Sequence, residues 1–296
     1  MVTHPARVLD RRAFLISAAA LAAAGPAFGA RGFRLAAVDW AMLETACALG
    51  HQPVAACELI GYRAESSVGD LPGVVDLGLR GAPNYELLQL TKPDLILSSP
   101  FYQQHQARLA SVAQVLSLGF YVPGEPPLAK ALAALEDLGA ATNSAAAAGQ
   151  ARAEAEAEFD ALARRAAAFQ DRPVCLIDIG DARHLRAFGF DSMFGDVLVR
   201  LGLQNAWSGQ TQFSFRAPLP LERLADTPEA RLVITGDIPT EAIGGLRRSI
   251  LWQALPQVAQ SRLYRMPTVN AFGGLPSAQR FARLLVQTFE AGPTTL

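Results

Sequence analysis

Short, almost continuously apolar runs alternate with helical patterns along the first half of the chain. Strands are predicted over residues 33–39, 52–59, 74–79, 94–99 and 114–119, and helices over residues 40–49 and 84–91. Strands that are apolar on both faces are typical of a parallel sheet covered by helices on both sides. The first half of the chain therefore predicts an α/β lobe.

The middle of the chain, residues 144–169, is dominated by alanine, glutamate and arginine. Alanine, glutamate and arginine are strong helix formers, Ser144 is a suitable N-cap, and Pro173 prevents the helix from continuing. At about 1.5 Å per residue, such a helix would be roughly 39 Å long. It is either an outer helix of one large domain or a rigid strut between two lobes, and we expect the strut.

The second half of the chain repeats the α/β pattern and predicts a second lobe. Its strands are predicted over residues 173–180, 231–237 and 262–267, and its helices over residues 191–202 and 277–291. In each half a short helix with a glutamate, Glu86 or Glu222, runs into a proline and then a strand. This weak duplication around a stiff connector indicates two similar lobes that face one another.

The N-terminal segment has the pattern of an export signal. Arg11 and Arg12 precede an apolar run over residues 13–24 and then a small-residue cleavage site. The apolar run is shorter than the roughly 20 residues that a membrane-spanning helix needs. The paired arginines favour a twin-arginine signal over an ordinary basic n-region. We expect cleavage near Gly29 and Ala30 and a mature protein in the periplasm.

These patterns divide the chain into four predicted segments. They are an export signal over residues 1–29, a lobe over residues 30–143, a backbone helix over residues 144–169 and a second lobe over residues 170–296. The expected fold class is α/β, with two Rossmann-like lobes and central sheets joined by one long interdomain helix. A formal net charge of −1 gives no reason to expect a nucleic-acid or anionic-membrane partner, and we expect a monomer.

The sequence carries no local signature of an enzyme or of a metal site. Dinucleotide-binding, P-loop, nucleophile-elbow and zinc-protease motifs are all missing from it, and its histidines do not have metal-ligand spacing. We therefore expect neither catalysis nor a cofactor. Cys47, Cys57 and Cys175 fit three small buried residues, although export would permit a disulfide between the first two.

Arg80 is the first candidate for ligand binding. It follows the strand over residues 74–79, at the carboxyl edge where open α/β sheets bind their ligands. Tyr102 follows the strand over residues 94–99, and the two side chains would share a crevice if these strands are neighbours. A guanidinium and a phenol both donate hydrogen bonds to negatively polarised oxygens, although a solvated or structural arginine is the alternative. The second lobe would add an aromatic wall, formed by Trp207, Phe213 and Phe215.

Several motifs resemble those of the periplasmic binding proteins for ferric hydroxamate siderophores, the helical-backbone class of ABC-importer receptors. They are GLR, PN, ELL and KP within residues 78–93, and FG, NAW and G-x-T within residues 188–211. The resemblance covers nearly all of the mature chain and implies the class III fold, in which one long helix bridges two lobes. It also implies that Arg80 and Tyr102 are the hydroxamate-binding arginine and tyrosine, and that Trp207 is the tryptophan of the NAW motif.

The resemblance implies a function as well. The protein would capture an iron(III)–siderophore complex, without ligating the metal itself, and deliver it to an inner-membrane ABC permease. Glu86 and Glu222 match the acids that meet arginines on that permease in this class. The alternatives keep the fold and change the ligand to cobalamin, haem or a catecholate siderophore, or make the protein an exported α/β hydrolase.

The chain departs from this family in the aromatic wall of the expected site. Ser214 stands between Phe213 and Phe215 where the family has a tryptophan. Asn270 replaces a second tryptophan, and Phe272 replaces a tyrosine. All five positions remain candidate ligand contacts, and the changes leave the particular siderophore open.

Overall fold

The computed structural model describes residues 32–211 and 219–296. The chain divides at Phe33, and the fold described here is that of Arg34–Leu296. The predicted export signal lies outside the described residues. Among the helices that are described, none combines the length and the hydropathy that a membrane span requires.

The N-terminal half forms a five-stranded sheet whose strands are all parallel, as the apolar runs predict. The strands are β1 (Leu35–Ala37), β2 (Ala55–Ala56), β3 (Val75–Asp76), β4 (Leu95–Ser98) and β5 (Gln114–Ser117). Their spatial order is β3-β2-β1-β4-β5, so the chain builds outward from β1 and then crosses to the other side. The order reverses between β1 and β4, which is where ligands bind in open α/β sheets.

Six helical segments lie between these strands or follow the last of them. They are α2 (Trp40–Ala48), α3 (Leu59–Glu65), α4 (Tyr85–Thr91), the 3₁₀ segment η1 (Pro100–His105), α5 (Gln106–Ala110) and α6 (Leu128–Ala141). Side-chain caps start α2 and α4, since Asp39 accepts from the Met42 N–H at 3.0 Å and Asn84 from the Leu87 N–H at 2.9 Å. The sequence patterns miss α3 and α6, and neither of these helices has a side-chain N-cap.

The C-terminal half forms a second five-stranded sheet, in the order β10-β9-β6-β7-β8. Its strands are β6 (Val174–Ile179), β7 (His184–Ala187), β8 (Leu219–Pro220), β9 (Arg231–Thr235) and β10 (Leu263–Met266). The expected similarity of the two sheets is incomplete, because β7 and β8 are antiparallel additions. The reason is local: Asp181 accepts from the Arg183 and His184 N–H groups and makes a tight turn after β6.

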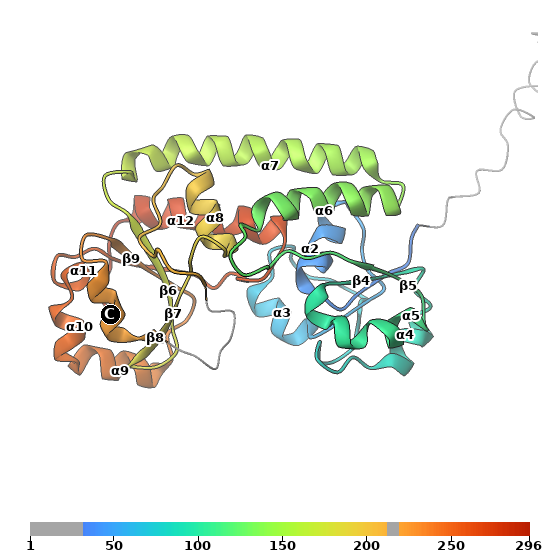
Figure 1. The fold of residues 1–296 in the computed structure, drawn as a ribbon, viewed down its shortest axis with the longest axis horizontal. Helices are drawn as coiled ribbons and strands as arrows, with labels where there is room; N and C mark the ends of the chain where they lie inside the picture. Colours follow the sequence, from blue (N-terminus) through green and yellow to red (C-terminus); the bar gives the residue numbers. More distant parts are fainter. Residues whose placement is uncertain (1–31, 212–218) are drawn as a thin grey trace, which may run out of the picture. The chain divides into compact units, whose positions relative to one another are not determined.

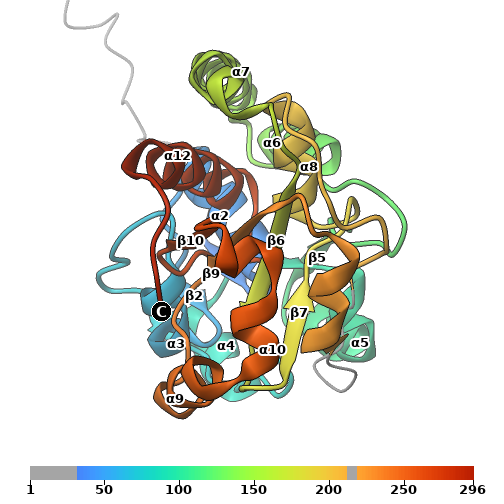
Figure 2. The same cartoon turned by 90° about the vertical axis from the view of Figure 1, so that its left-hand side faces the viewer.

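The helices of this half pack against the second sheet. They are α8 (Met193–Arg200), the 3₁₀ segment η3 (Leu221–Asp226), α9 (Thr240–Arg248), α10 (Ile250–Ala254), α11 (Pro256–Ala259) and α12 (Leu275–Ala291). Figure 2 shows α9 and α10 beside the strands. Leu246 and Trp252 bring these two helices into the same buried core as Ile177 and Ile234 of the sheet.

The predicted backbone helix is present as α7 (Ala145–Ala166), followed by a 3₁₀ turn, η2 (Ala167–Phe169). In Figure 1 it runs from the half that contains β1–β5 to the half that contains β6–β10. It packs against α6 and α12, burying a stripe that includes Ala148, Phe159 and Leu162. Because α12 also packs against α2, the two sheets are joined through helices as well as through the chain.

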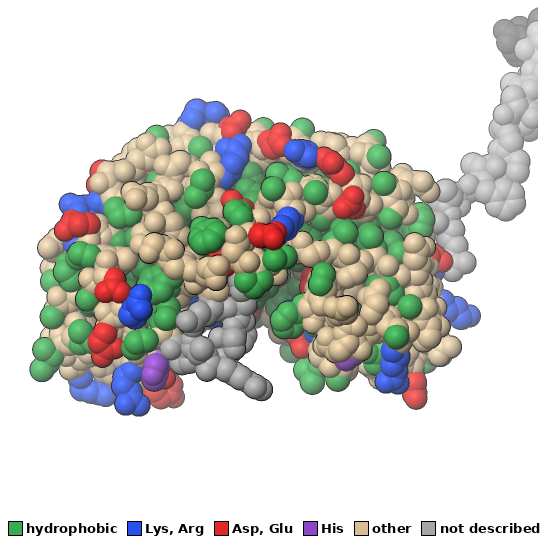
Figure 3. Space-filling view, in the orientation of Figure 1, with side chains coloured by type: hydrophobic (Ala, Val, Ile, Leu, Met, Phe, Trp, Pro, Cys, Tyr) green, Lys and Arg blue, Asp and Glu red, His purple; other side chains and the backbone are tan. Residues whose placement is uncertain are grey.

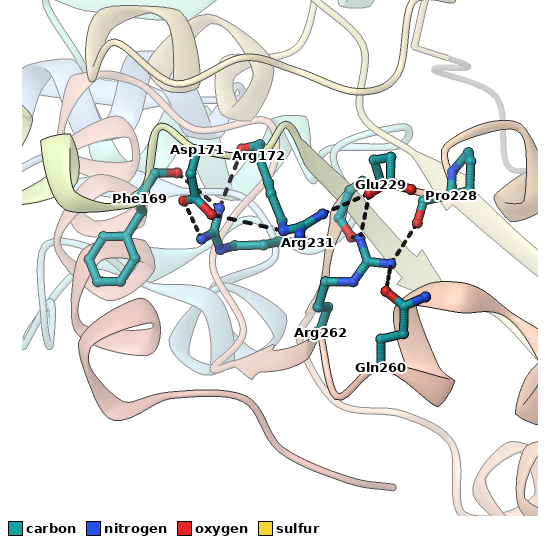
Figure 4. Close-up of polar contacts among 9 residues, drawn as sticks. Phe169, Asp171, Arg172, Pro228, Glu229, Arg231, Gln260 and Arg262 are labelled. Carbon is teal, nitrogen blue, oxygen red and sulfur yellow. Dashed lines mark hydrogen bonds and ion pairs between the residues drawn. The ribbon is translucent and has the colours of Figure 1, made fainter.

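A polar network anchors the end of this connector to the second sheet (Figure 4). Arg231 donates to an Asp171 carboxylate oxygen at 2.6 Å and to the Phe169 carbonyl at 3.0 Å. Arg262 donates to the Pro228 carbonyl at 2.9 Å and to the Gln260 side-chain oxygen at 2.8 Å. These arginines lie at the start of β9 and just before β10, so the network holds the amino edge of the sheet.

Candidate functional site

The carboxyl edge of the first sheet carries a polar site at the point where the strand order reverses. Asp39 follows β1 and Ser99 follows β4, and the Ser99 hydroxyl donates to an Asp39 carboxylate oxygen at 2.9 Å. Burial raises the pKa of Asp39, and the hydrogen bonds from Met42 and Ser99 oppose that effect. This pair therefore links the ends of β1 and β4, two neighbouring strands from which the chain continues to opposite sides of the sheet.

Arg80 lies over this edge. Its Nε donates to Glu58 Oε2 at 2.6 Å, and its backbone N–H donates to Glu58 Oε1 at 3.0 Å. The guanidinium carbon lies 3.7 Å from the centre of the Trp40 ring, in a cation–π contact. Among the described residues, neither Nη nitrogen of Arg80 has a hydrogen-bond partner. The side chain is thus fixed at one end and has donors left at the other.

The strands before Arg80 and Tyr102 are not neighbours, so the condition placed on their sharing a crevice is not met. β2 and β1 separate β3 from β4. Glu58 follows β2 and Trp40 follows β1, and together they hold Arg80 back toward the centre of the sheet. Sequence reasoning singled out neither Glu58 nor Trp40 as a site residue; the available signal was that both follow an apolar run.

Tyr102 is 6% exposed and packs in the core of the first half with Leu77 and Leu88. Burial raises the pKa of its hydroxyl to about 12, while the positive charge of Arg80 lowers it and the charge of Asp39 raises it. Tyr102 and Arg80 therefore act on one another electrostatically at the same edge. No direct hydrogen bond joins them within the described part of the chain.

The second half contributes an aromatic and basic wall. The Phe272 and Tyr121 rings meet edge to face with centres 5.4 Å apart. The guanidinium carbon of Arg186 lies 6.0 Å from the Phe272 ring, and an Arg186 Nη donates to Asp178 at 2.9 Å. Arg186 was missed by sequence reasoning, although the polar and apolar residues of β7 alternate and the partly exposed Arg186 lies on the polar face.

The surface is hollowed between the part that contains the first sheet and the part that contains the second (Figure 3). Charges from both sides of the hollow act on the carboxylate of Glu65. They are the positive charge of Arg80 from the first half, and the positive charge of Arg186 and the negative charge of Asp178 from the second. The sheet edge that carries Arg80 and the aromatic and basic wall of the second half therefore face a common gap.

The remaining aromatic candidates have other surroundings. Trp207 is 7% exposed and belongs to the core of the second half, where its indole N–H has no hydrogen-bond partner among the described residues. Phe213, Ser214 and Phe215 lie outside the described residues.

Asn270 is fully buried and contacts Glu44, a carboxylate that sequence reasoning missed. Glu44 accepts hydrogen bonds from five donors: the Tyr62 hydroxyl, the Asn270 amide, the Ser277 hydroxyl and the backbone N–H groups of Gly274 and Ser277. A Cβ on Gly273 would lie 2.5 Å from its Oε2 oxygen, so this approach needs glycine. Glu44 belongs to α2 and most of its partners to the start of α12, so this contact joins the two halves.

The two candidate docking acids lie on the surface of different halves. Glu86 is in the first turn of α4 and Glu222 in the first turn of η3, and both are exposed. Neither makes an ion pair with another described residue. A hollow of about 530 Å³ beside Glu86 is lined by Tyr85, His105 and Arg108, among others.

The structure gives no indication of a resident metal or of a disulfide. Among the described residues, no group of three or more His, Cys, Asp or Glu side chains could hold a metal ion. Cys47, Cys57 and Cys175 are free thiols, and burial raises the pKa of each to about 12.

Comparison with known proteins gives a consistent result. The profile of the family described as "Periplasmic binding protein" matches residues 35–269. The iron(3+)-hydroxamate-binding protein FhuD of Escherichia coli (strain K12) is 32% identical over 253 residues, which is 85% of this chain and 85% of that protein.

Solved structures share the fold. The Fe³⁺–Desferal-bound siderophore-binding protein FhuD from Vibrio cholerae is 24% identical, with a TM-score of 0.79 over 89% of this chain and 100% of that one. FhuD2 from Staphylococcus aureus with bound ferrioxamine B is 17% identical, with a TM-score of 0.66 over 86% and 97%. These likenesses confirm the predicted fold class, with two α/β lobes and one long helix.

Proposed function

This chain belongs to the periplasmic binding protein family, a family of binding proteins, and we propose that it captures an iron(III)–hydroxamate siderophore for an inner-membrane ABC permease. The relative that is 32% identical binds iron(3+)-hydroxamate, as its name states. The geometry of the candidate site, and of Arg80 above all, supports this proposal.

The observation that carries the proposal is the state of Arg80. Its Nε is used by Glu58 and its guanidinium face by Trp40, while both Nη nitrogens lack a partner among the described residues. Hydroxamate oxygens around iron(III) are negatively polarised, and a guanidinium edge donates to such oxygens strongly. Because the holding contacts are already made, little side-chain freedom is lost when the ligand binds.

Tyr102 is the second proposed donor. A phenol whose pKa is raised to about 12 by burial stays protonated at neutral pH, so its O–H is available to donate. The iron arrives inside the chelate, and the protein contacts only the ligand around it. Phe272 would cover apolar parts of the ligand, with Phe213, Ser214 and Phe215 as further proposed contacts. Trp207 and Asn270 are buried and would support this wall from behind, Asn270 by accepting from the Phe272 backbone N–H at 3.0 Å.

Delivery and location follow from the same proposal. Glu86 and Glu222, exposed acids on different halves, would meet arginines of the permease. Residues 1–29 would direct export to the periplasm. Replacing Arg11→Lys together with Arg12→Lys in the full chain should stop periplasmic accumulation if the signal is of the twin-arginine type.

Binding is tested with the mature protein by titrating its tryptophan fluorescence. The panel is ferrichrome, ferrioxamine B, a ferric catecholate, haem and cobalamin, with Arg80→Ala measured beside the unaltered protein. We expect saturable binding of a ferric hydroxamate that weakens at least about tenfold in Arg80→Ala, since a charge-assisted hydrogen bond is worth about 1.5–3 kcal/mol. Binding of only the catecholate, haem or cobalamin would overturn the hydroxamate assignment, and turnover of an ester panel would favour the hydrolase.

Docking is tested separately, by siderophore-dependent growth of cells that express each variant. Glu86→Ala and Glu222→Ala should impair growth on the siderophore while the purified proteins bind it normally. Glu241→Ala is the matched control, because Glu241 is also an exposed acid in a first helical turn of the second half. An equal effect of all three substitutions would refute the specific docking role.

A further inference from the structure

Glu65 is a half-buried carboxylate that the fold does not use. It is the last residue of α3, and its carboxylate makes neither an ion pair nor a hydrogen bond with any other described residue. A negative charge in the last turn of a helix also faces the negative end of the helix dipole, which is unfavourable. An acid in such a place does not stabilise α3, and the favourable charges that act on it, those of Arg80 and Arg186, do so without a direct contact.

The position of Glu65 is at the gap between the two halves. Two residues further along the chain, the Ser67 hydroxyl lies 3.0 Å from the Ser277 hydroxyl at the start of α12. The charges that act on Glu65 come from Arg80 on one side and from Asp178 and Arg186 on the other. Figure 1 shows α3 on the side of the first half that borders the second, and Figure 3 shows the hollow there.

The two arginines whose charges act on Glu65 are each already paired with another carboxylate. Arg80 is neutralised by Glu58 at 2.6 Å, and Arg186 is paired with Asp178 at 2.9 Å. Arg80 and Arg186 thus each already have a carboxylate partner. Glu65 is left as an additional negative charge, in a partly buried position where an ion pair is screened less than at the surface.

We propose that Glu65 recognises a cationic group of the ligand, so that the preferred cargo is a ferric hydroxamate that carries a primary amine. This inference rests on the proposed function and deepens it by naming the ligand class. Arg80 and Tyr102 would bind the oxygens around the iron, and Glu65 would bind the ammonium at the rim of the same gap. Glu65 is therefore a specificity-determining residue rather than a general anchor.

The test uses two chelates that differ in one charge. Ferrioxamine B ends in a primary ammonium, and its N-acetylated form keeps the three hydroxamates and the iron but is neutral at that end. Affinities of both are measured by fluorescence titration for the unaltered mature protein, for Glu65→Gln and for Asp70→Asn. Asp70 is the matched control, an exposed acid five residues away.

We expect the unaltered protein and Asp70→Asn to prefer the amine-bearing chelate by about tenfold, the usual size of one charge-assisted contact. In Glu65→Gln the preference should disappear, with affinity for the acetylated chelate unchanged, which also shows that the variant is folded. Equal affinities in the unaltered protein, or a preference that survives in Glu65→Gln, would overturn this inference alone. Failure of both chelates to bind would overturn the proposed function, and this inference with it.

Discussion

Two arginines at sheet edges have opposite surroundings. Arg231, at the amino edge of the second sheet, is 8% exposed, and each of its Nη nitrogens donates to the protein, one of them to Asp171. The side chain of Arg80, beyond the carboxyl edge of the first sheet, is 26% exposed. Within the described part of the chain, only its Nε and backbone N–H donate hydrogen bonds, both to Glu58.

The difference in burial and in hydrogen-bond partners indicates that Arg231 stabilises the fold and that Arg80 binds a ligand. A buried guanidinium must have its donors satisfied by the fold, because water cannot reach them. A guanidinium that is held at Nε and stacked on Trp40 has a fixed direction but keeps donors for another molecule. The comparison therefore separates a structural arginine from a binding arginine by which nitrogens are used, and the following predictions test that separation.

The largest effect is expected at Glu44, a buried charge that, like Arg231, is surrounded by partners from the fold. Burial raises its pKa from the ordinary 4.5 to about 7, and its hydrogen bonds oppose the rise. Between these two pH values the folded protein holds a proton that the unfolded chain has released. The free energy of unfolding should therefore fall as pH rises across that window, by on the order of 3 kcal/mol.

Urea denaturation at several pH values measures this slope. In Glu44→Gln residue 44 cannot titrate, so the free energy of unfolding of this variant should depend less on pH than that of the unaltered protein. The new amide nitrogen faces hydrogen-bond donors, which lowers the stability of the variant at every pH. The other buried acids whose pKa is raised are present in both proteins and cancel in the difference. An identical slope in the variant would show that Glu44 is not the titrating group.

The next effect is expected for Arg231→Met, which keeps an apolar stem and removes the guanidinium. Two backbone carbonyls lose a donor and the contact with Asp171 is lost, so the free energy of unfolding should fall by about 2–3 kcal/mol. Affinity for the siderophore should not change. Arg63→Met, at an exposed position without a described polar partner, is the control.

Arg80→Met should give the reverse result. Because the Arg80–Glu58 pair is partly exposed, its loss should change the free energy of unfolding by less than about 1 kcal/mol. The affinity for a ferric hydroxamate should nevertheless fall by at least about tenfold. Urea denaturation and siderophore titration of the same preparation measure the two quantities. A variant that loses stability without losing affinity would show that the role of Arg80 is structural.

Much of the fold could be predicted from local patterns. Apolar runs predict the parallel first sheet, and the composition of residues 144–169 predicts α7 to within a turn. The strand order could not be predicted, because it depends on pairing between distant segments, and for that reason the sequence could not show that the strands before Arg80 and Tyr102 are not neighbours. These residues still act at one edge, because Glu58 and Trp40 redirect Arg80.

The charged residues of the gap were harder to predict for a related reason. Glu44 meets Asn270 and Ser277, which are 226 and 233 residues away in the sequence. Glu65 stands out only because its carboxylate has no ion-pair or hydrogen-bond partner among the described residues. The sequence alone cannot show this. The family motif could point to Arg80, but nothing local distinguishes Glu44 or Glu65 from a solvated acid on a helix.

The smallest effect is expected where an arginine has carboxylate partners but its side chain is 41% exposed, as for Arg152. Arg152, on α7, contacts both Glu136 and Glu156, which is one carboxylate more than Arg231 contacts through Asp171 alone. These contacts are open to water, which screens the charges and competes for every donor. Arg152→Ala should therefore leave the urea midpoint unchanged within error, at low and at high salt alike. A loss as large as that of Arg231→Met would mean that the number of carboxylates, rather than the burial of the guanidinium, makes an arginine structural in this fold.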